Sequence, residues 1–365
     1  MRVAIIDADL INRKKHRFPN LASMKLSGYH KSVGDEVILK TDYSDLEDFD
    51  KVYISKVFTD TPINPEALDF PNVEYGGTGF YFDKAPALPC DVEHSKPDYH
   101  LYDDFIEDQI DHGVKRSEFK EYTDYSIGFI TRGCFRKCGF CVNQKYDKVF
   151  EASPLEEFFD PDRPKICLLD DNFLGFPNWR ERLEELRATD KPFKFKQGLD
   201  ERLLTPEKCE LLFTSKYDKE ITFAFDRIED YSLIESKLRM IREITDRAIK
   251  FYVLVGYDST GKYDSGFYKR DIENMFRRIE LLGKYGAYPY IMRYERYKDS
   301  PYRGVYITVA CWCNQVSFFK KETFNQFIDS TNDFQEVAPK RYRENILKDY
   351  PEIGRYFDRR FFERI

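Results

Sequence analysis

The stretch Gly133-Cys134-Phe135-Arg136-Lys137-Cys138-Gly139-Phe140-Cys141 decides how the rest of this sequence is interpreted. It carries three thiols within eight residues, with the spacing C-x3-C-x2-C. The stretch directly follows residues 125–131, whose apolar side chains predict a β-strand. Three core thiols are not expected to gather in one loop by chance, so this spacing indicates a metal site.

Counting ligands separates the kinds of metal site that three thiols can form. A [4Fe–4S] cube has four irons, and each takes one external ligand. Three thiolates from a short loop therefore leave one iron open, and an open position lets a small molecule bind the metal directly. A structural zinc site would need a fourth Cys or His from elsewhere, and no second C-x2-C pair is spaced for it. Buried free thiols are the remaining alternative.

Strand and helix signals divide the α/β chain into four parts. Residues 1–100 predict a small Rossmann-like domain with a parallel sheet, and residues 101–122 a linker with short helices. Residues 123–298 contain six strand–helix units in series, which predict a barrel-like parallel sheet, closed or open, whose working residues lie where strands end. Residues 299–365 predict a mostly helical C-terminal extension. Strands are expected at 2–6, 36–39, 52–55, 73–75, 125–131, 165–169, 193–197, 221–225, 250–256 and 288–293, and helices at 21–31, 179–188, 206–215, 232–245 and 271–285.

Composition limits the partners and the location of the protein. The chain has 365 residues and a formal net charge of −7, and no RNA-binding appendage is visible, so nucleic acid is not expected as a partner. No apolar run reaches 18 residues, so no membrane span is expected, and the first residues have the pattern of a strand rather than a signal peptide. We therefore expect a cytoplasmic protein whose eight cysteines stay reduced.

The cysteine loop, with the aromatic Phe140 before its last cysteine, resembles the signature of the radical S-adenosylmethionine (SAM) superfamily. The resemblance covers residues 123–295, and the six strand–helix units are similar to that family's partial (β/α)6 TIM-like barrel, which is the fold that the resemblance implies here. It implies that Cys134, Cys138 and Cys141 hold a [4Fe–4S] cluster at which SAM is reductively cleaved to a 5′-deoxyadenosyl radical. It also implies an electron donor such as flavodoxin or ferredoxin. The substrate stays unidentified, and a small molecule, a lipid or a peptide is compatible with the sequence.

The same resemblance implies further cofactor contacts at the ends of later strands. Residues 169–173 take the place of the family's stretch for the SAM amino group, with Asp-Asp-Asn-Phe where Gly-Gly-Glu is usual. An N-cap for the next helix is their alternative role. For Arg202 the choice lies between the SAM carboxylate and a surface ion pair with Glu201 or Glu207. The residues implied in cofactor binding are Phe140, Asp170, Asp171, Asn172, Gln197, Asp200, Arg202, Asp226, Val255, Gly256 and Arg293.

Residues 1–80 resemble the cobalamin-binding domain that precedes the barrel in many radical SAM proteins, including a glycine turn at residues 76–79. The Asp-x-His-x-x-Gly motif that supplies an imidazole to cobalt is missing, and His16 and His30 lie outside its frame. We therefore expect a degenerate domain without cobalamin, although some family members hold cobalamin without that imidazole. A cobalamin-dependent radical SAM methyltransferase and a non-catalytic zinc or iron–sulfur protein remain as alternatives.

The remaining cysteines are expected to be structural. Cys311 and Cys313 provide too few ligands for a second cluster, and residues 304–318 predict a buried strand. Cys167 and Cys209 lie in apolar surroundings and are expected in the core.

Overall fold

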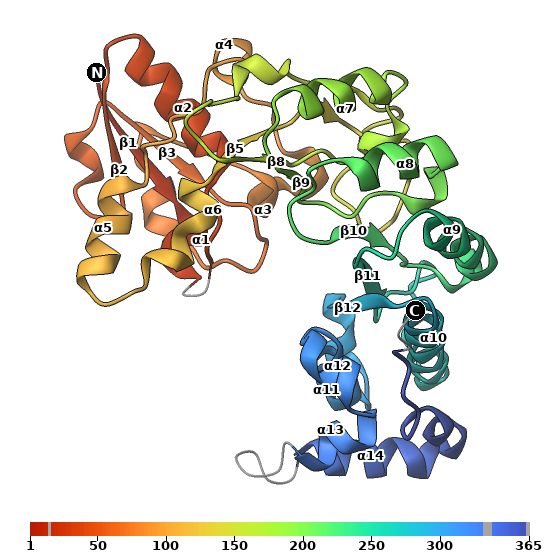
Figure 1. The fold of residues 1–365 in the computed structure, drawn as a ribbon. Coiled ribbons are helices and arrows are strands. Elements are labelled where there is room, and N and C mark those ends of the chain that lie inside the picture. The colour runs from red at the N-terminus through yellow and green to blue at the C-terminus, as the bar shows by residue number, and fades with distance from the viewer. Residues whose placement is uncertain (14–15, 331–337, 363–365) are drawn as a thin grey trace. The chain divides into compact units, whose positions relative to one another are not determined.

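The computed structural model describes residues 1–13, 16–330 and 338–362. The chain forms two compact units, Met1–Lys196 and Gln197–Ile365, and both mix parallel sheets with helices (Figure 1). The α/β class predicted from the sequence is confirmed. The predicted domain boundaries near residues 100, 122 and 298 stay predictions.

The first unit begins with a four-stranded parallel sheet in the order β2-β1-β3-β4. The central strand β1 is apolar from residue 3 to residue 6 and is fully buried there, which explains why it pairs on both sides. The helix α2 follows because Asn20 caps it, with its side chain accepting from the Ser23 amide. The elements are β1 (Arg2–Asp7), α1 (Ala8–Asn12), α2 (Leu21–Ser32), β2 (Glu36–Lys40), β3 (Lys51–Ser55), β4 (Val73–Gly76), α3 (Thr78–Tyr81) and α4 (Cys90–Glu93).

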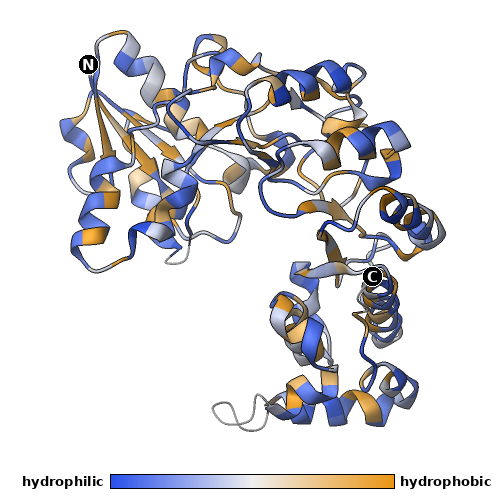
Figure 2. Cartoon of the chain, in the orientation of Figure 1, coloured by the Kyte–Doolittle hydropathy of each residue, from blue (hydrophilic) through white to orange (hydrophobic). Residues whose placement is uncertain are grey.

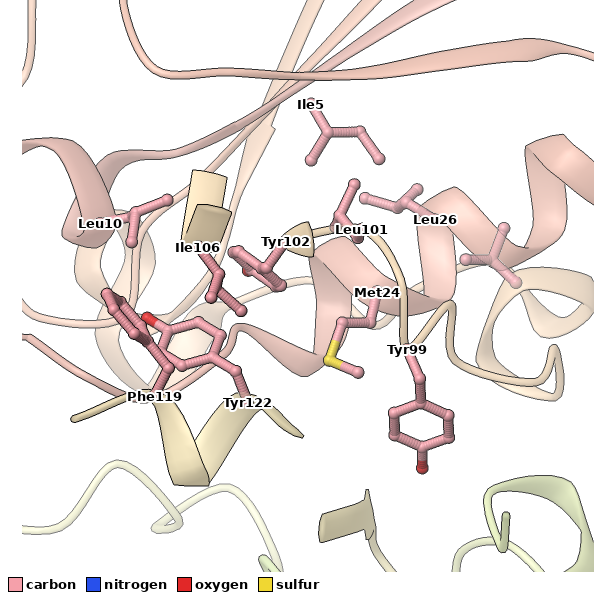
Figure 3. Close-up of a cluster of buried hydrophobic side chains, with 11 residues drawn as sticks. Ile5, Leu10, Met24, Leu26, Tyr99, Leu101, Tyr102, Ile106, Phe119 and Tyr122 are labelled. Carbon is pink, nitrogen blue, oxygen red and sulfur yellow. The ribbon is translucent and has the colours of Figure 1, made fainter. Parts of the chain in front are cut away.

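The predicted linker contributes to the core of this unit. It contains α5 (Asp103–Asp111) and α6 (Lys120–Thr123), and its aromatic and aliphatic side chains pack against α2 and the sheet (Figure 3). Phe119 is fully buried, so this segment stabilises the fold through removal of apolar surface from water. The cluster consists of Ile5, Leu10, Met24, Leu26, Val92, Tyr99, Leu101, Tyr102, Ile106, Phe119 and Tyr122.

A second parallel sheet of the first unit carries the cysteine loop. Its strands are β5 (Tyr125–Gly128), β8 (Lys165–Leu168) and β9 (Phe193–Phe195), in the order β5-β8-β9, and α7 (Trp179–Ala188) follows β8. Between β5 and β8 lies a short antiparallel pair, β6 (Thr131–Arg132) and β7 (Phe150–Glu151). This pair closes the base of the cysteine loop.

The second unit contains a three-stranded parallel sheet, β10-β11-β12. Leu199 adds a parallel bridge to Phe223 beside it. The strands of this sheet contain many hydrophobic residues, which are coloured orange in Figure 2. The six strands predicted for the barrel are therefore present, in two sheets, and their closure into one barrel stays a prediction. The elements are α8 (Pro206–Thr214), β10 (Ile221–Ala224), α9 (Tyr231–Ile244), β11 (Ile249–Val255), α10 (Ser265–Lys284) and β12 (Ala287–Arg293).

The C-terminal region is helical, and the predicted strand at residues 304–318 is wrong. Residues 303–313 form a helix in which Arg303, Ile307 and Cys311 are exposed while most residues between them are buried. Exposure at every fourth residue is typical of a helix with one solvent-exposed face. No described helix is both long and apolar enough to cross a membrane. The helices are α11 (Arg303–Cys313), α12 (Val316–Lys321), α13 (Phe324–Ser330) and α14 (Ala338–Asp349).

Candidate functional site

The cysteine loop leaves β6 at Gly133, which has φ = +86°. A Cβ atom there would lie 2.4 Å from the Lys148 carbonyl oxygen, so the close return of the chain to β7 requires glycine. Within the loop, the Cys141 amide donates to the Cys138 carbonyl at 2.9 Å, which turns the chain between the last two thiols. Cys134, Cys138 and Cys141 are all half-buried and form no disulfide.

Hydrogen-bond donors point at the sulfurs of Cys134 and Cys141. Cys134 Sγ accepts from the backbone amide of Arg136 at 3.3 Å and from Asn172 Nδ2 at 3.2 Å. Cys141 Sγ accepts from the backbone amide of Asn143 at 3.4 Å. Burial raises the pKa of the Cys141 thiol. Donors of this kind favour sulfur that carries negative charge, as in a metal-bound thiolate.

Among the residues described by the structure, no three His, Cys, Asp or Glu side chains are grouped as ligands of a single ion. Ligands of one zinc ion must each approach it to about 2.3 Å. In a [4Fe–4S] cluster each thiolate instead binds a different iron, so the loop is compatible with the cluster and its thiols need not meet.

Asp170 ties the entry of the loop to the end of β8. It is almost fully buried, and its Oδ1 accepts from the Thr131 amide and the Thr131 hydroxyl, both at 2.7 Å. Its Oδ2 accepts from the Ile130 amide at 3.2 Å. Burial raises the pKa of Asp170 to about 7, against these hydrogen bonds, which lower it. Both oxygens therefore serve the protein's own backbone and hydroxyl groups.

Asp171 joins the two ends of the same loop. Its Oδ2 accepts from the Gly133 amide and its Oδ1 from Asn143 Nδ2, both at 2.7 Å. Burial raises its pKa, while these bonds and the nearby Arg132 and Lys145 lower it. The carboxylate thus bridges residues on either side of the three thiols.

Asn172 completes the stretch after β8. It is 4% exposed, its Nδ2 faces Cys134, and its Oδ1 is buried without a hydrogen-bond partner among the described residues. A buried acceptor without a partner is costly and indicates a missing ligand or water. A ligand ammonium group beside the loop would satisfy it. The alternative N-cap role is not seen, because none of these three side chains caps α7 and Asn178 is its N-cap residue.

In the second unit, Arg202 is engaged with carboxylates. Its Nε donates to Asp200 Oδ1 at 2.6 Å, and its Nη1 lies 3.3 Å from Asp230 Oδ2. Arg202 therefore forms an ion pair, which was its alternative role, but the partners are Asp200 and Asp230 and not the expected Glu201 or Glu207. Gln197 is exposed at the start of this unit.

A buried charge network lies where β10 and β11 end. Asp226 accepts from the Leu254 amide at 3.1 Å, and burial raises its pKa. Arg278 is 2% exposed and donates to the carbonyls of Phe225, Asp226 and Leu254. Sequence reasoning missed Arg278, because an arginine in an amphipathic helix is normally read as exposed.

Gly256 directly follows β11, and Arg293 is the last residue of β12. Gly256 has φ = +76°, and its amide donates to Asp271 Oδ2 at 2.7 Å. Val255 is fully buried. Arg293 is exposed, with its guanidinium 4.8 Å from the centre of the Tyr297 ring. The predicted SAM contacts of these residues, and of Phe140 in the cysteine loop, stay predictions.

The other cysteines divide by burial. Cys167 and Cys209 are fully buried, which confirms their place in the core. Cys311 is exposed and Cys313 is buried. Residues two apart in a helix point in different directions, so these two thiols do not form a joint metal site.

The fold is similar to that of a solved radical SAM protein, which agrees with the fold expected from the resemblance of the cysteine loop. No family model and no curated protein matches the sequence. The solved structure of the radical SAM methyltransferase TsrM from Kitasatospora setae, with cobalamin and a [4Fe–4S] cluster bound, matches with a TM-score of 0.51 and 13% identity. The match covers 80% of this chain and 72% of that one. The cobalamin-dependent SAM radical enzyme OxsB, with aqua-cobalamin and SAM bound, gives a TM-score of 0.46 and 14% identity over 97% of this chain and 61% of that one.

Proposed function

We propose that this chain is a radical SAM enzyme whose cluster is held by Cys134, Cys138 and Cys141. The observation that supports this most directly is the three-thiol loop, which follows β5 and β6 and is held by side chains that follow β8, in a fold similar to that of TsrM. When bound, a [4Fe–4S] cluster supplies the electron that cleaves SAM to methionine and a 5′-deoxyadenosyl radical. The substrate on which this chemistry would act is unidentified, and the proposal takes it to be a small molecule, a lipid or a peptide.

The protein's own part is to bind and orient. The three thiols provide one ligand each, and Asp170 and Asp171 fix the path of the loop through its backbone amides. The buried Oδ1 of Asn172 is the acceptor best placed for the SAM ammonium group, because it has no other partner among the described residues. Arg202 is a weaker candidate for the SAM carboxylate, because it would have to give up a carboxylate partner.

Charge near the loop supports an acidic electron donor such as flavodoxin or ferredoxin. Residues 132–148 contain five Lys or Arg and one Asp, in a chain whose net charge is −7. Lys145 and Lys148 are exposed. A local basic patch on an acidic protein attracts an acidic partner and speeds its association at low salt.

Anaerobic reconstitution tests the proposal. We expect wild-type protein with iron, sulfide, SAM and dithionite to hold about four irons per chain and to release 5′-deoxyadenosine. Cys138→Ala should lose both, and Cys90→Ala, an exposed cysteine outside the loop, should retain both. Equal release by wild type and Cys138→Ala would contradict the proposal. One zinc per chain without labile sulfide would instead support the non-catalytic binding protein.

A cobalamin-dependent methyltransferase is the second candidate, because TsrM carries cobalamin and shares the fold. The carboxyl edge of the first sheet, where such sheets bind ligands, is filled by the chain itself. Asp7 caps α1 and accepts from the Tyr102 hydroxyl at 2.9 Å, and Asn20 donates to Ser55 at 2.8 Å. These bonds engage polar groups that a ligand at this edge would otherwise contact, and no step is assigned to cobalt.

Equilibrium dialysis of the full chain against hydroxocobalamin and methylcobalamin separates the two candidates. The filled edge of the sheet predicts no retention of either form. Retention at about one equivalent per chain would favour the methyltransferase and would show that the network around Asp7 opens.

A further inference from the structure

We infer that Asn172 sets the reduction potential of the cluster through its amide hydrogen bond to Cys134. The inference rests on the proposed function, because it requires a cluster on the three thiols. It gives Asn172 a positioning and tuning role that is separate from any contact with SAM. The Nδ2–Sγ distance of 3.2 Å is that of an N–H···S hydrogen bond.

The position of Asn172 is fixed from several sides. Its backbone carbonyl accepts from the Gly175 amide at 2.9 Å, and its side chain is 4% exposed. Phe135 of the loop packs onto Gly175, where a Cβ atom would lie 2.8 Å from the ring. Asp171, the preceding residue, holds both ends of the loop. The amide and the sulfur are therefore held together by bonds that do not depend on each other.

The orientation of the amide follows from the chemistry of its neighbour. A cluster-bound sulfur carries negative charge and accepts hydrogen bonds, so the NH2 group must face it. The reverse orientation would place the carbonyl oxygen against the sulfur, which brings two acceptors together. The observed orientation leaves Oδ1 without a partner among the described residues, so the bond to sulfur is retained at a cost.

A donor at a cluster sulfur favours the reduced state. Reduction adds an electron that is shared with the sulfurs, and an N–H dipole stabilises the added charge. Hydrogen bonds to the sulfurs are among the factors that set the potential of Fe–S clusters. Asn172 should therefore raise the potential and make the cluster easier to reduce. The other donors described above, from Arg136 and Asn143, are backbone amides and remain in any side-chain variant.

The experiment is a redox titration of the reconstituted full chain without SAM, followed by EPR of the reduced cluster. In Asn172→Ala the reduced-to-oxidised ratio at a fixed potential should fall about tenfold, which corresponds to about 59 mV for a one-electron couple. Asn172→Asp keeps the size of the side chain, removes the donor and should shift the ratio in the same direction. Asn143→Ala is the matched control. It removes the bond to Asp171 but keeps the backbone donor to Cys141, so the potential should stay at the wild-type value.

Each outcome decides the inference. An unchanged potential in Asn172→Ala or Asn172→Asp, with four irons still bound, overturns it. An equal shift in Asn143→Ala also overturns it, because loosening of the loop would then explain the effect. Loss of the cluster from both Asn172 variants, while wild type keeps it, assigns Asn172 a structural role only. Absence of a cluster from wild type is a different result, because it refutes the proposed function itself.

Discussion

Replacement of Asp170 should destabilise the entry of the cysteine loop in a graded way. Asp170 accepts three hydrogen bonds, two at Oδ1 from Thr131 and one at Oδ2 from Ile130. Asp170→Ala leaves all three buried donors without an acceptor, at about 1–3 kcal/mol for each group, so we expect a loss of about 4 kcal/mol. Asp170→Asn can keep the two bonds at Oδ1, but its NH2 group would face the Ile130 amide, which is also a donor. We therefore expect a loss of stability of about 1–2 kcal/mol.

The pH dependence of these losses follows from the raised pKa of Asp170, which burial places at about 7. A carboxyl with a raised pKa in the folded state binds its proton more tightly there than in the unfolded chain. Its contribution to stability is therefore fully present below about pH 4 and is lost as the pH rises through about 7. Asp170→Asn does not titrate, so its deficit relative to wild type should be smaller at pH 8 than at pH 5.

Urea unfolding at pH 5 and pH 8, followed by circular dichroism, measures both effects. Asp162→Ala is the control, because this carboxylate belongs to the same unit and is exposed. The control should stay within about 0.5 kcal/mol of wild type. The argument fails if Asp170→Ala is as stable as the control, or if the deficit of Asp170→Asn grows between pH 5 and pH 8.

Three further predictions concern positions outside the cysteine loop. Gly256→Ala should cost more unfolding free energy than Gly261→Ala. Both glycines have positive φ, but only at Gly256 would the new Cβ contact another side chain, that of Tyr297, at 3.0 Å. Thermal unfolding compares the two variants, and equal Tm values would contradict the steric argument. Folded apoprotein should react at Cys311 with a thiol reagent while Cys313 reacts only after unfolding, which peptide mass spectrometry can show; equal labelling would contradict the helix. Tyr102→Phe should cost about 2 kcal/mol, because it removes one buried hydroxyl that both donates and accepts a hydrogen bond; a loss below 0.5 kcal/mol in urea unfolding would refute this.

Periodic apolar patterns predicted most elements. The errors concern the start of α10, which an N-cap residue sets, and α11, which contains a run of β-branched residues. α10 was expected at residue 271 but begins at Ser265, because Asp264 caps it by accepting from the Phe267 amide at 2.7 Å. Aspartate is a preferred N-cap residue, so this start of the helix is visible in the sequence. α11 was expected as a strand because β-branched residues favour strands, but tertiary packing overrides that preference.

The candidate site divides in the same way between what a sequence can and cannot show. The thiol ligands were predictable because cluster ligation fixes their spacing within one loop. The hydrogen bonds of Asp170 and Asp171 to that loop were not, because they join residues about 40 positions apart and depend on the pairing of β5 with β8. The pairing of Arg202 with Asp230 depends in the same way on how residues 28 positions apart meet in the fold.

The geometry of the loop therefore comes from β8 more than from the loop itself. Residues 133–141 contain two glycines and few groups that could fix their own path, so isolated they would sample many conformations. The buried carboxylate of Asp170, the half-buried carboxylate of Asp171 and the amide of Asn172 bind the entry, both ends and one thiol of the loop. Because these bonds lie within the protein, the thiols are held in place before any cluster binds. A substitution at Asp170 or Asp171 should then impair cluster assembly without removing a single ligand, and that separates support of the site from ligation.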